Sequence, residues 1–155
     1  MQHVTAVKTS PSQKIADELT HFLADTYALY LKTQNFHWNV KGPHFYSLHK
    51  MFEEQYQELA AAVDEIAERI RALGSYTPAS FSQFASLSSL KEATSEINAE
   101  NMIQKLLKDH EAMMNHSAMI ITKAQKVHDE STADLLIQRQ KAHEKTAWML
   151  KSSLR

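Results

Sequence analysis

The amino-acid sequence predicts an all-α chain that folds as one domain with four long helices. A length of 155 residues is enough for a single domain of ordinary size with a substantial core. The chain has only 2 Gly and 3 Pro, and 43% of its residues are hydrophobic, which is typical of helical proteins. Within the long segments, apolar residues recur every three or four positions, as they do in amphipathic helices.

The first helix is expected to follow a short flexible tail formed by residues 1–9, which show no periodicity. Ser10 suits the N-cap position, Pro11 suits the first helical position, and Gln13 completes a capping box. The helix should therefore begin at Pro11, and its periodicity continues to about Asn39. Its apolar stripe consists of Ile15, Leu19, Phe22, Leu29 and Phe36.

Gly42 and Pro43 separate the first helix from a second one. The residue before a proline is disfavoured in the helical region, whereas proline itself suits the start of a helix. The second helix should span 44–73 and end at Gly74, a common residue type just past a helix C-terminus. The two helices then form a hairpin. The apolar positions of the second helix are Leu48, Phe52, Gln55, Leu59, Val63, Ile66, Ile70 and Leu73.

A long serine-rich connection occupies residues 75–95, and its FSQFAS segment is expected to form a single short helix. Connections of this length are unusual in compact domains. About 20 residues can span the roughly 45 Å of a 30-residue helix, so the chain can return and start a third helix parallel to the second. Helices at about 96–127 and 131–152, joined by a tight turn, then complete a four-helix bundle. The third helix is expected to bury Ile103, Leu106, His110, Met113, Ile120 and Val127.

Five side chains of the first hairpin have the types and spacing of metal ligands. His49 and Glu53 are four residues apart, as are Asp64 and Glu68, so each pair lies on one helix face, one turn apart. His37 and His49 are equally distant from the turn, so an antiparallel hairpin should place them face to face. The sequence therefore predicts one half-site with two histidines and another half-site with two carboxylates.

Distance keeps these two half-sites apart within one chain. At about 1.5 Å rise per residue, His49 and Asp64 lie roughly 22 Å apart along the helix, about ten times a metal–ligand distance. A complete site therefore requires the carboxylates of one subunit to meet the histidines of another. The competing interpretation is structural, with hydrogen-bonded histidines and a solvated acidic helix face. Trp38 and Tyr56 are expected to anchor a core or an interface rather than take part in redox chemistry.

A second arrangement stays open, because Glu18 and His21 form an E-x-x-H motif of the kind that di-iron helical bundles place inside a single subunit. Distance from the turn would place this motif opposite Asp64 and Glu68. Such sites use two E-x-x-H motifs, however, and the third and fourth predicted helices contain none. The site between subunits is therefore the preferred hypothesis.

Two longer motifs connect these residues to a known family. The run H-W-x-V-x-G-x5-L-H-x3-E from His37 to Glu53, followed by D-x-x-A-E-R from Asp64 to Arg69, resembles the signature of the Dps family. These are miniferritins, named as DNA-binding proteins from starved cells. The resemblance implies a ferritin-like four-helix bundle with a ferroxidase centre at a two-fold subunit interface. The implied ligands are His37, His49 and Glu53 of one subunit with Asp64 and Glu68 of its mate.

The resemblance also implies an activity. Two Fe(II) ions held by imidazole and carboxylate would reduce hydrogen peroxide to water, and Fe(III) would be stored as a mineral in a hollow shell of twelve subunits with 23 symmetry. Such chemistry protects against oxidative damage. Where many relatives carry Asp, this chain has Glu53, whose longer side chain alters the reach of that ligand. An acidic segment that matches the family's three-fold iron-entry pore contains Asp129, Glu130 and Asp134, although carboxylates there would also stabilise a helix N-terminus.

Composition and the N-terminal sequence bear on the cellular setting. The chain has no cysteine, which excludes a disulfide framework, a thiolate metal site and a cysteine nucleophile. The N-terminal segment lacks the apolar region of a secretion signal, and no stretch approaches about 18 consecutive apolar residues. We therefore expect a cytoplasmic protein with no membrane span. Association with the nucleoid is the alternative, and it depends on whether the protein binds DNA.

DNA compaction, with iron chemistry secondary, is the competing function, and the charge distribution argues against it. The net charge is -1, from 17 basic and 18 acidic residues. Relatives that compact DNA by electrostatics carry several basic residues on a terminal tail. Here the first eleven residues contain only Lys8 besides the terminal amine, and Lys151 and Arg155 lie near the other end.

We predict little or no DNA binding at neutral pH and physiological salt. Affinity falls with a log–log slope of about -0.9 per phosphate contact, so the one or two contacts that each tail offers should be lost, even with avidity from twelve tails. A gel-shift titration across salt concentrations measures this. Complexes that persist near about 0.15 M salt would make compaction the main function. A second titration below the reference pKa of about 6.5 would test whether protonated His3 strengthens binding.

Overall fold

The computed structural model describes residues 9–155, which contain five helices and no strand. The tail predicted for residues 1–9 lies, except for its last residue, outside the described residues, as do His3 and Lys8. Across the described range, no helix combines the length and the apolar character that crossing a bilayer requires. The helices are α1 (Pro11–Asn39), α2 (Phe45–Ala72), α3 (Phe81–Leu87), α4 (Ala99–Lys126) and α5 (Glu130–Ser152).

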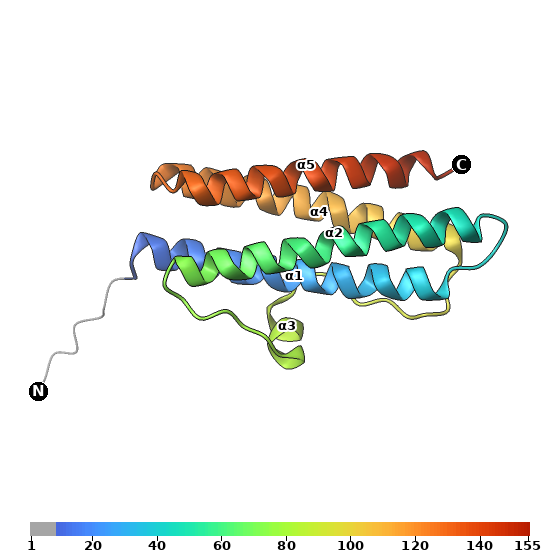
Figure 1. Ribbon diagram of the computed structural model, residues 1–155, viewed down its shortest axis with the longest axis horizontal. Helices are drawn as coiled ribbons and strands as arrows, with labels where there is room; N and C mark the ends of the chain where they lie inside the picture. The colour runs from blue at the N-terminus through green and yellow to red at the C-terminus, as the bar shows by residue number, and fades with distance from the viewer. Residues whose placement is uncertain (1–8) are drawn as a thin grey trace, which may run out of the picture.

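The four long helices form the predicted bundle with one long crossover. Figure 1 shows α1 and α2 as one antiparallel hairpin and α4 and α5 as another. The crossover, which includes α3, runs back along the bundle, so α4 starts at the end where α2 started and runs in the same direction. Helix α1 packs on α4, α2 touches α5, and α3 packs against α1. The predicted fold class and topology are therefore confirmed.

Local signals fix the helix ends. The backbone N–H of Gln13 donates to Ser10 Oγ at 3.2 Å, which makes Ser10 the predicted N-cap of α1. Gly42 and Gly74 have φ angles of +119° and +94°, in the left-handed region that favours glycine, and they lie in the turn before α2 and just past its end. The first two helices consequently end within one residue of the predicted positions.

The second hairpin differs slightly from the prediction. Helix α4 begins at Ala99 rather than near residue 96, because Asn98 Oδ1 accepts a hydrogen bond from the Asn101 N–H at 2.8 Å and caps the helix.

The predicted core positions of α1 are all buried. Val127, predicted to be buried, is 42% exposed, because it follows the last helical residue and lies in the turn between α4 and α5. Val63 of α2 and Leu73, which follows the last residue of α2, are only partly buried.

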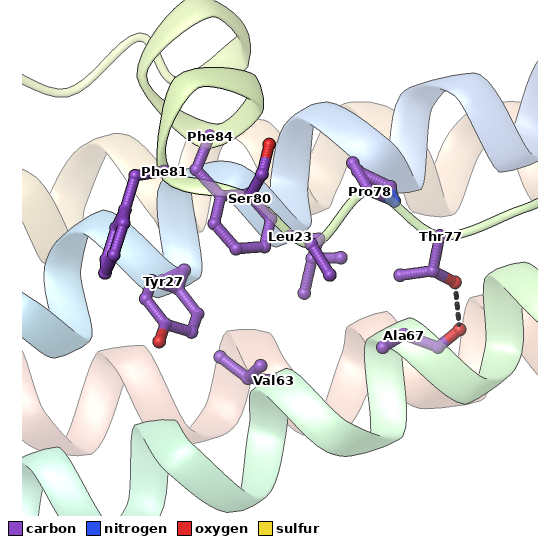
Figure 2. Close-up of a pocket in the computed structure, with 10 residues that line it drawn as sticks. Leu23, Tyr27, Val63, Ala67, Thr77, Pro78, Ser80, Phe81 and Phe84 are labelled. Carbon is purple, nitrogen blue, oxygen red and sulfur yellow. Dashed lines mark hydrogen bonds between the residues drawn. The ribbon is translucent and has the colours of Figure 1, made fainter.

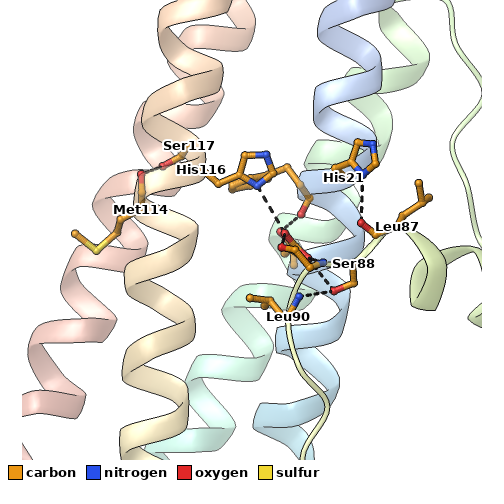
Figure 3. Close-up of polar contacts among 11 residues, drawn as sticks. His21, Leu87, Ser88, Leu90, Met114, His116 and Ser117 are labelled. Carbon is orange, nitrogen blue, oxygen red and sulfur yellow. Dashed lines mark hydrogen bonds and ion pairs between the residues drawn. The ribbon is translucent and has the colours of Figure 1, made fainter.

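Buried Asp25 ties the crossover to the bundle. Its carboxylate accepts hydrogen bonds from Ser88 Oγ at 2.8 Å and from the Ser89 N–H at 2.6 Å, and His116 of α4 lies 3.6 Å away (Figure 3). Burial alone would raise the pKa of Asp25, but the hydrogen bonds from His116, Ser88 and Ser89 outweigh it and lower that pKa. The crossover is therefore held at its midpoint by a charged acceptor with several donors.

A second buried polar cluster joins α4 to α5. Arg139 Nη2 donates to His143 Nε2 at 3.4 Å, so the proton of neutral His143 is on Nδ1, which donates to His110 Nδ1 at 2.8 Å. His110 must then carry its own proton on Nε2, which is buried without a partner in the described chain. Burial, with Arg139 nearby, lowers the pKa of His110 to about 3. Burial also lowers the pKa of His143, with the charges of His110 and Arg139 adding to it.

These two histidines should make the fold sensitive to acid. The folded state keeps them neutral, whereas the unfolded chain takes up protons below pH of about 6.5, so stability falls as pH falls through that value. Between pH 7 and pH 5, we expect His110 alone to cost about 2 kcal/mol of unfolding free energy per chain. Denaturant unfolding at fixed protein concentration at the two pH values measures this loss.

His110→Gln should lower stability at pH 7 but should shrink the difference between the two pH values, because the variant has one titrating group fewer. His44→Gln is the matched control, because His44 is exposed. It should keep the pH dependence of the unmodified chain. An unchanged pH dependence in His110→Gln would contradict the prediction.

Candidate metal centre

The turn of the first hairpin brings His37 and His49 together. Helix α1 ends at Asn39, Gly42 reverses the chain, and the Phe45 N–H donates to the Gly42 carbonyl at 3.1 Å. The two imidazole rings lie face to face, with their centroids 3.9 Å apart and an interplanar angle of 14°. Their equal distance from the turn therefore predicts their pairing correctly.

Each histidine donates a hydrogen bond to the backbone of the other. His37 Nδ1 lies 2.7 Å from the His49 carbonyl oxygen, and His49 Nδ1 lies 2.7 Å from the His37 carbonyl oxygen. A carbonyl oxygen only accepts, so both Nδ1 atoms must carry protons. In the neutral rings both Nε2 atoms then have lone pairs, and these are the atoms that metal ions bind.

The carboxylates of α2 are placed differently. Glu53, one turn after His49, is partly exposed, and Lys50 Nζ lies 3.3 Å from its Oε2. Asp64 and Glu68 are exposed on α2, about three and four turns beyond Glu53. Among residues 9–155, no three His, Asp or Glu side chains come close enough to hold one ion. The structure thus brings together the histidine half-site and leaves the two-carboxylate half-site on the surface of the same helix.

The alternative motif at Glu18 and His21 is used for other contacts. Glu18 forms an ion pair with Lys123 of α4, and His21 Nδ1 lies 3.2 Å from the Leu87 carbonyl oxygen (Figure 3). Neither residue joins Asp64 and Glu68 in a cluster of ligands within the described chain. The alternative site within one subunit therefore gains no support from the described chain, because Glu18 pairs with the other hairpin and His21 with the crossover.

The three acidic residues of the predicted pore segment have different surroundings. Asp129 caps α5, accepting from the Thr132 N–H at 3.0 Å, and Arg69 Nη2 donates to it at 2.8 Å. Burial would raise the pKa of Asp129, but the hydrogen bonds from Thr132 and the charge of Arg69 lower it. In the described chain, Asp129 therefore stabilises the N-terminus of α5. Glu130 and Asp134 have exposed side chains.

The sequence interpretation missed two partnerships among the histidines that were expected to have no matched partner. His110 pairs with His143, and His116 lies beside Asp25. Each pair joins different helices, so spacing within one helix gives no signal. In an antiparallel hairpin, residues at equal distances from the turn face each other. Applied to the turn between α4 and α5, this relation would have placed His110 and His143 within about one helical turn of each other.

Known proteins are similar to this chain in both sequence and fold. The family model for the ferritin-like domain matches residues 16–155. "DNA protection during starvation protein 2" of Bacillus anthracis is 41% identical over 143 residues, which cover 92% of this chain and 98% of that protein.

Solved structures agree. The crystal structure of a Dps protein from Bacillus brevis superposes with a TM-score of 0.90 at 36% identity, covering 94% of this chain and 98% of that one. The Dps protein from Vibrio cholerae, described as a member of a broad superfamily of ferritin-like diiron-carboxylate proteins, gives 0.92 at 32% identity, covering 99% and 97%. The chain therefore belongs to the Dps family of ferritin-like proteins.

Proposed function

We propose that this protein oxidises Fe(II) at sites shared between two subunits and stores the Fe(III) as a mineral inside a closed shell. The observation that carries the proposal is the reciprocal hydrogen bonding of His37 and His49, which leaves two Nε2 lone pairs beside each other. The Nδ1 hydrogen bonds would also suit a structural role, but the Nε2 lone pairs are what a metal ion can use. The family membership and the diiron-carboxylate description of the Vibrio cholerae relative support iron as the substrate.

The donor set suits Fe(II). Neutral imidazole nitrogen and carboxylate oxygen together are ligands that iron accepts, and the chain has no cysteine that would favour softer metals. His37, His49 and Glu53 would bind from one subunit, and Asp64 and Glu68 from its mate. The ring positions of both histidines are set before iron arrives, because each Nδ1 is already hydrogen-bonded.

Hydrogen peroxide is the proposed oxidant. Two Fe(II) ions supply the two electrons that reduce one peroxide molecule to water, so no hydroxyl radical is released. The shell would take up iron through acidic pores to which Asp129, Glu130 and Asp134 contribute, and it would protect a cytoplasmic compartment from oxidative damage. DNA compaction remains the less favoured function, because the two ends of the chain carry few basic residues.

Exposed apolar side chains support assembly into a shell. A single chain leaves several large apolar residues open to water, and burying them between subunits would favour assembly. Trp38 is 62% exposed and Phe81 is 83% exposed, and both belong to the first hairpin or its crossover. Others in the described chain are Leu31, Tyr76, Met119, Ile137 and Trp148.

Each half-site should be necessary, and the two halves should complement each other between subunits. His49→Ala and Asp64→Ala should each abolish fast Fe(II) oxidation by peroxide, because each removes part of every site. When the two variants are refolded together in equal amounts, half of the two-fold dimers are hybrids, and each hybrid regains one intact site, so about a quarter of the sites should recover. Stopped-flow absorbance of Fe(III) formation measures both results.

Two neighbouring substitutions serve as matched controls. His44→Ala and Glu65→Ala alter exposed residues of the same types near each half-site and should leave oxidation unchanged. Full activity in pure His49→Ala or pure Asp64→Ala would contradict the ligand assignment. An inactive His21→Ala together with an active His37→Ala would support the site within one subunit instead.

The mass of the assembly in solution tests the proposed shell. We expect sedimentation to show one species of twelve chains, each of 17.7 kDa, under the conditions in which Fe(II) oxidation is fast. The count of twelve is what the family resemblance implies, and the physical reason for assembly is that a single chain contributes only incomplete sites. A mass near one or two chains, with oxidation still fast, would contradict the closed shell.

A further inference from the structure

Four aromatic rings follow one another along the seam between α1 and α2, and the row begins at the candidate metal centre. The Tyr56 ring meets the His37 ring edge-on, with centroids 5.2 Å apart. The Tyr30 ring lies 6.0 Å from that of Tyr56, and the Tyr27 ring lies 5.6 Å from that of Tyr30. Each tyrosine is therefore in contact with the next, and the first is in contact with a proposed iron ligand.

The row ends beside an apolar groove. Tyr27 stacks on Phe84 of α3, with centroids 4.7 Å apart and planes at 21°. Figure 2 shows Tyr27 close to Phe81 and Phe84 on one side, with Val63 of α2 below it, in a groove of about 380 Å³. A phenylalanine ring is much harder to oxidise than a phenol, so Tyr27 is the last ring of the row that can readily lose an electron.

Ring packing alone does not require tyrosine at these three positions. Edge-to-face contacts stabilise phenylalanine rings as well as tyrosine rings. What the three residues share beyond a ring is a phenol, which can lose one electron and one proton together. All three are partly buried, and Tyr30 also accepts a hydrogen bond from Gln34 Nε2 at 3.4 Å.

The other redox-active rings nearby are not connected in this way. Trp38 is next to His37 in the sequence, but within the described chain it is 62% exposed, as expected of a contact between subunits. Tyr46 and Tyr76 are 71% and 89% exposed. Only the row of Tyr56, Tyr30 and Tyr27 gives the candidate metal centre a continuous series of phenols in the described structure.

We infer that these three tyrosines form an electron relay that completes peroxide reduction when a site holds a single Fe(II). This inference rests on the proposed function. One Fe(II) provides one electron and peroxide requires two, so Tyr56 provides the second. Tyr56 thus has a redox role beyond the anchoring role expected of it from the sequence alone. The balanced step is Fe(II) + H2O2 + Tyr56–OH + H⁺ → Fe(III) + Tyr56–O• + 2 H2O. The O–O bond breaks, both oxygen atoms leave as water, and the phenolic proton is consumed with one proton from solvent.

The relay then moves the oxidised position away from iron. Tyr30 gives an electron to Tyr56, and Tyr27 gives one to Tyr30, while each phenol that is oxidised loses its proton and each that is reduced regains one. The radical thus comes to rest on Tyr27, at the groove, three rings from the site. Without such a donor, half-reduced peroxide would leave the site as hydroxyl radical.

Freeze-quench electron paramagnetic resonance of the intact shell tests this inference. The shell is loaded with one Fe(II) per His37/His49 pair, mixed with hydrogen peroxide, and compared with the same protein made with ring-deuterated tyrosine. We expect a tyrosyl radical in the unmodified chain, loss of most of that signal in Tyr56→Phe, and a matching rise in hydroxyl radical caught by a spin trap. Tyr46→Phe, the exposed control on the same helix, should behave as the unmodified chain does.

A second variant separates a relay from a packing role. In Tyr30→Phe the ring contacts stay, so the radical should form with the same yield but should decay faster, because it cannot leave Tyr56. An undiminished radical in Tyr56→Phe, or unaltered decay in Tyr30→Phe, would overturn the relay. Oxidation of fully loaded shells is measured in the same samples. Its absence from the unmodified chain would refute the proposed function, whereas normal oxidation with an unchanged radical in Tyr56→Phe would refute the relay alone.

Discussion

The pair of hydrogen bonds between His37 and His49 is the interaction on which the candidate metal centre depends. It closes the first hairpin next to its turn, where the left-handed Gly42 reverses the chain. It also determines which nitrogen of each ring carries the proton, and this decides whether the ring can bind a metal ion. A structural contact of the hairpin therefore also prepares the site.

A comparison with the second histidine pair shows why proton placement matters. His110 and His143 are also in contact, but His143 Nε2 accepts from Arg139 and His110 Nδ1 accepts from His143. Both acceptor nitrogens are occupied, and the remaining His110 Nε2 carries a buried proton. This pair has no lone pair to offer, so it stabilises the seam between α4 and α5 rather than binding metal.

Ion pairs hold the two hairpins in register. Lys32 of α1 and Asp109 of α4 form a pair with N and O atoms 2.6 Å apart and both side chains largely buried, and Arg139 of α5 pairs with Glu58 of α2. Removing one partner of a buried pair typically costs about 3–5 kcal/mol, because the other charge is left without compensation. With Asp25 fixing the crossover, these contacts hold the surface of α2 that carries Asp64 and Glu68 in a set position relative to the rest of the bundle.

The sequence by itself determined the helices, their order and the histidine half-site. Periodicity, Ser10, Gly42 and Gly74 are local signals, and the position of a tight turn decides which residues face each other near it, as it does for His37 and His49. Farther along the helices, the position of the turn does not decide which partner a side chain takes. Only the tertiary structure could show that Glu18 pairs with Lys123, that Asp129 caps α5, and that Tyr56, Tyr30 and Tyr27 touch. Those contacts depend on how the helices rotate about their axes and on where the long crossover lies, which no residue spacing along the chain encodes.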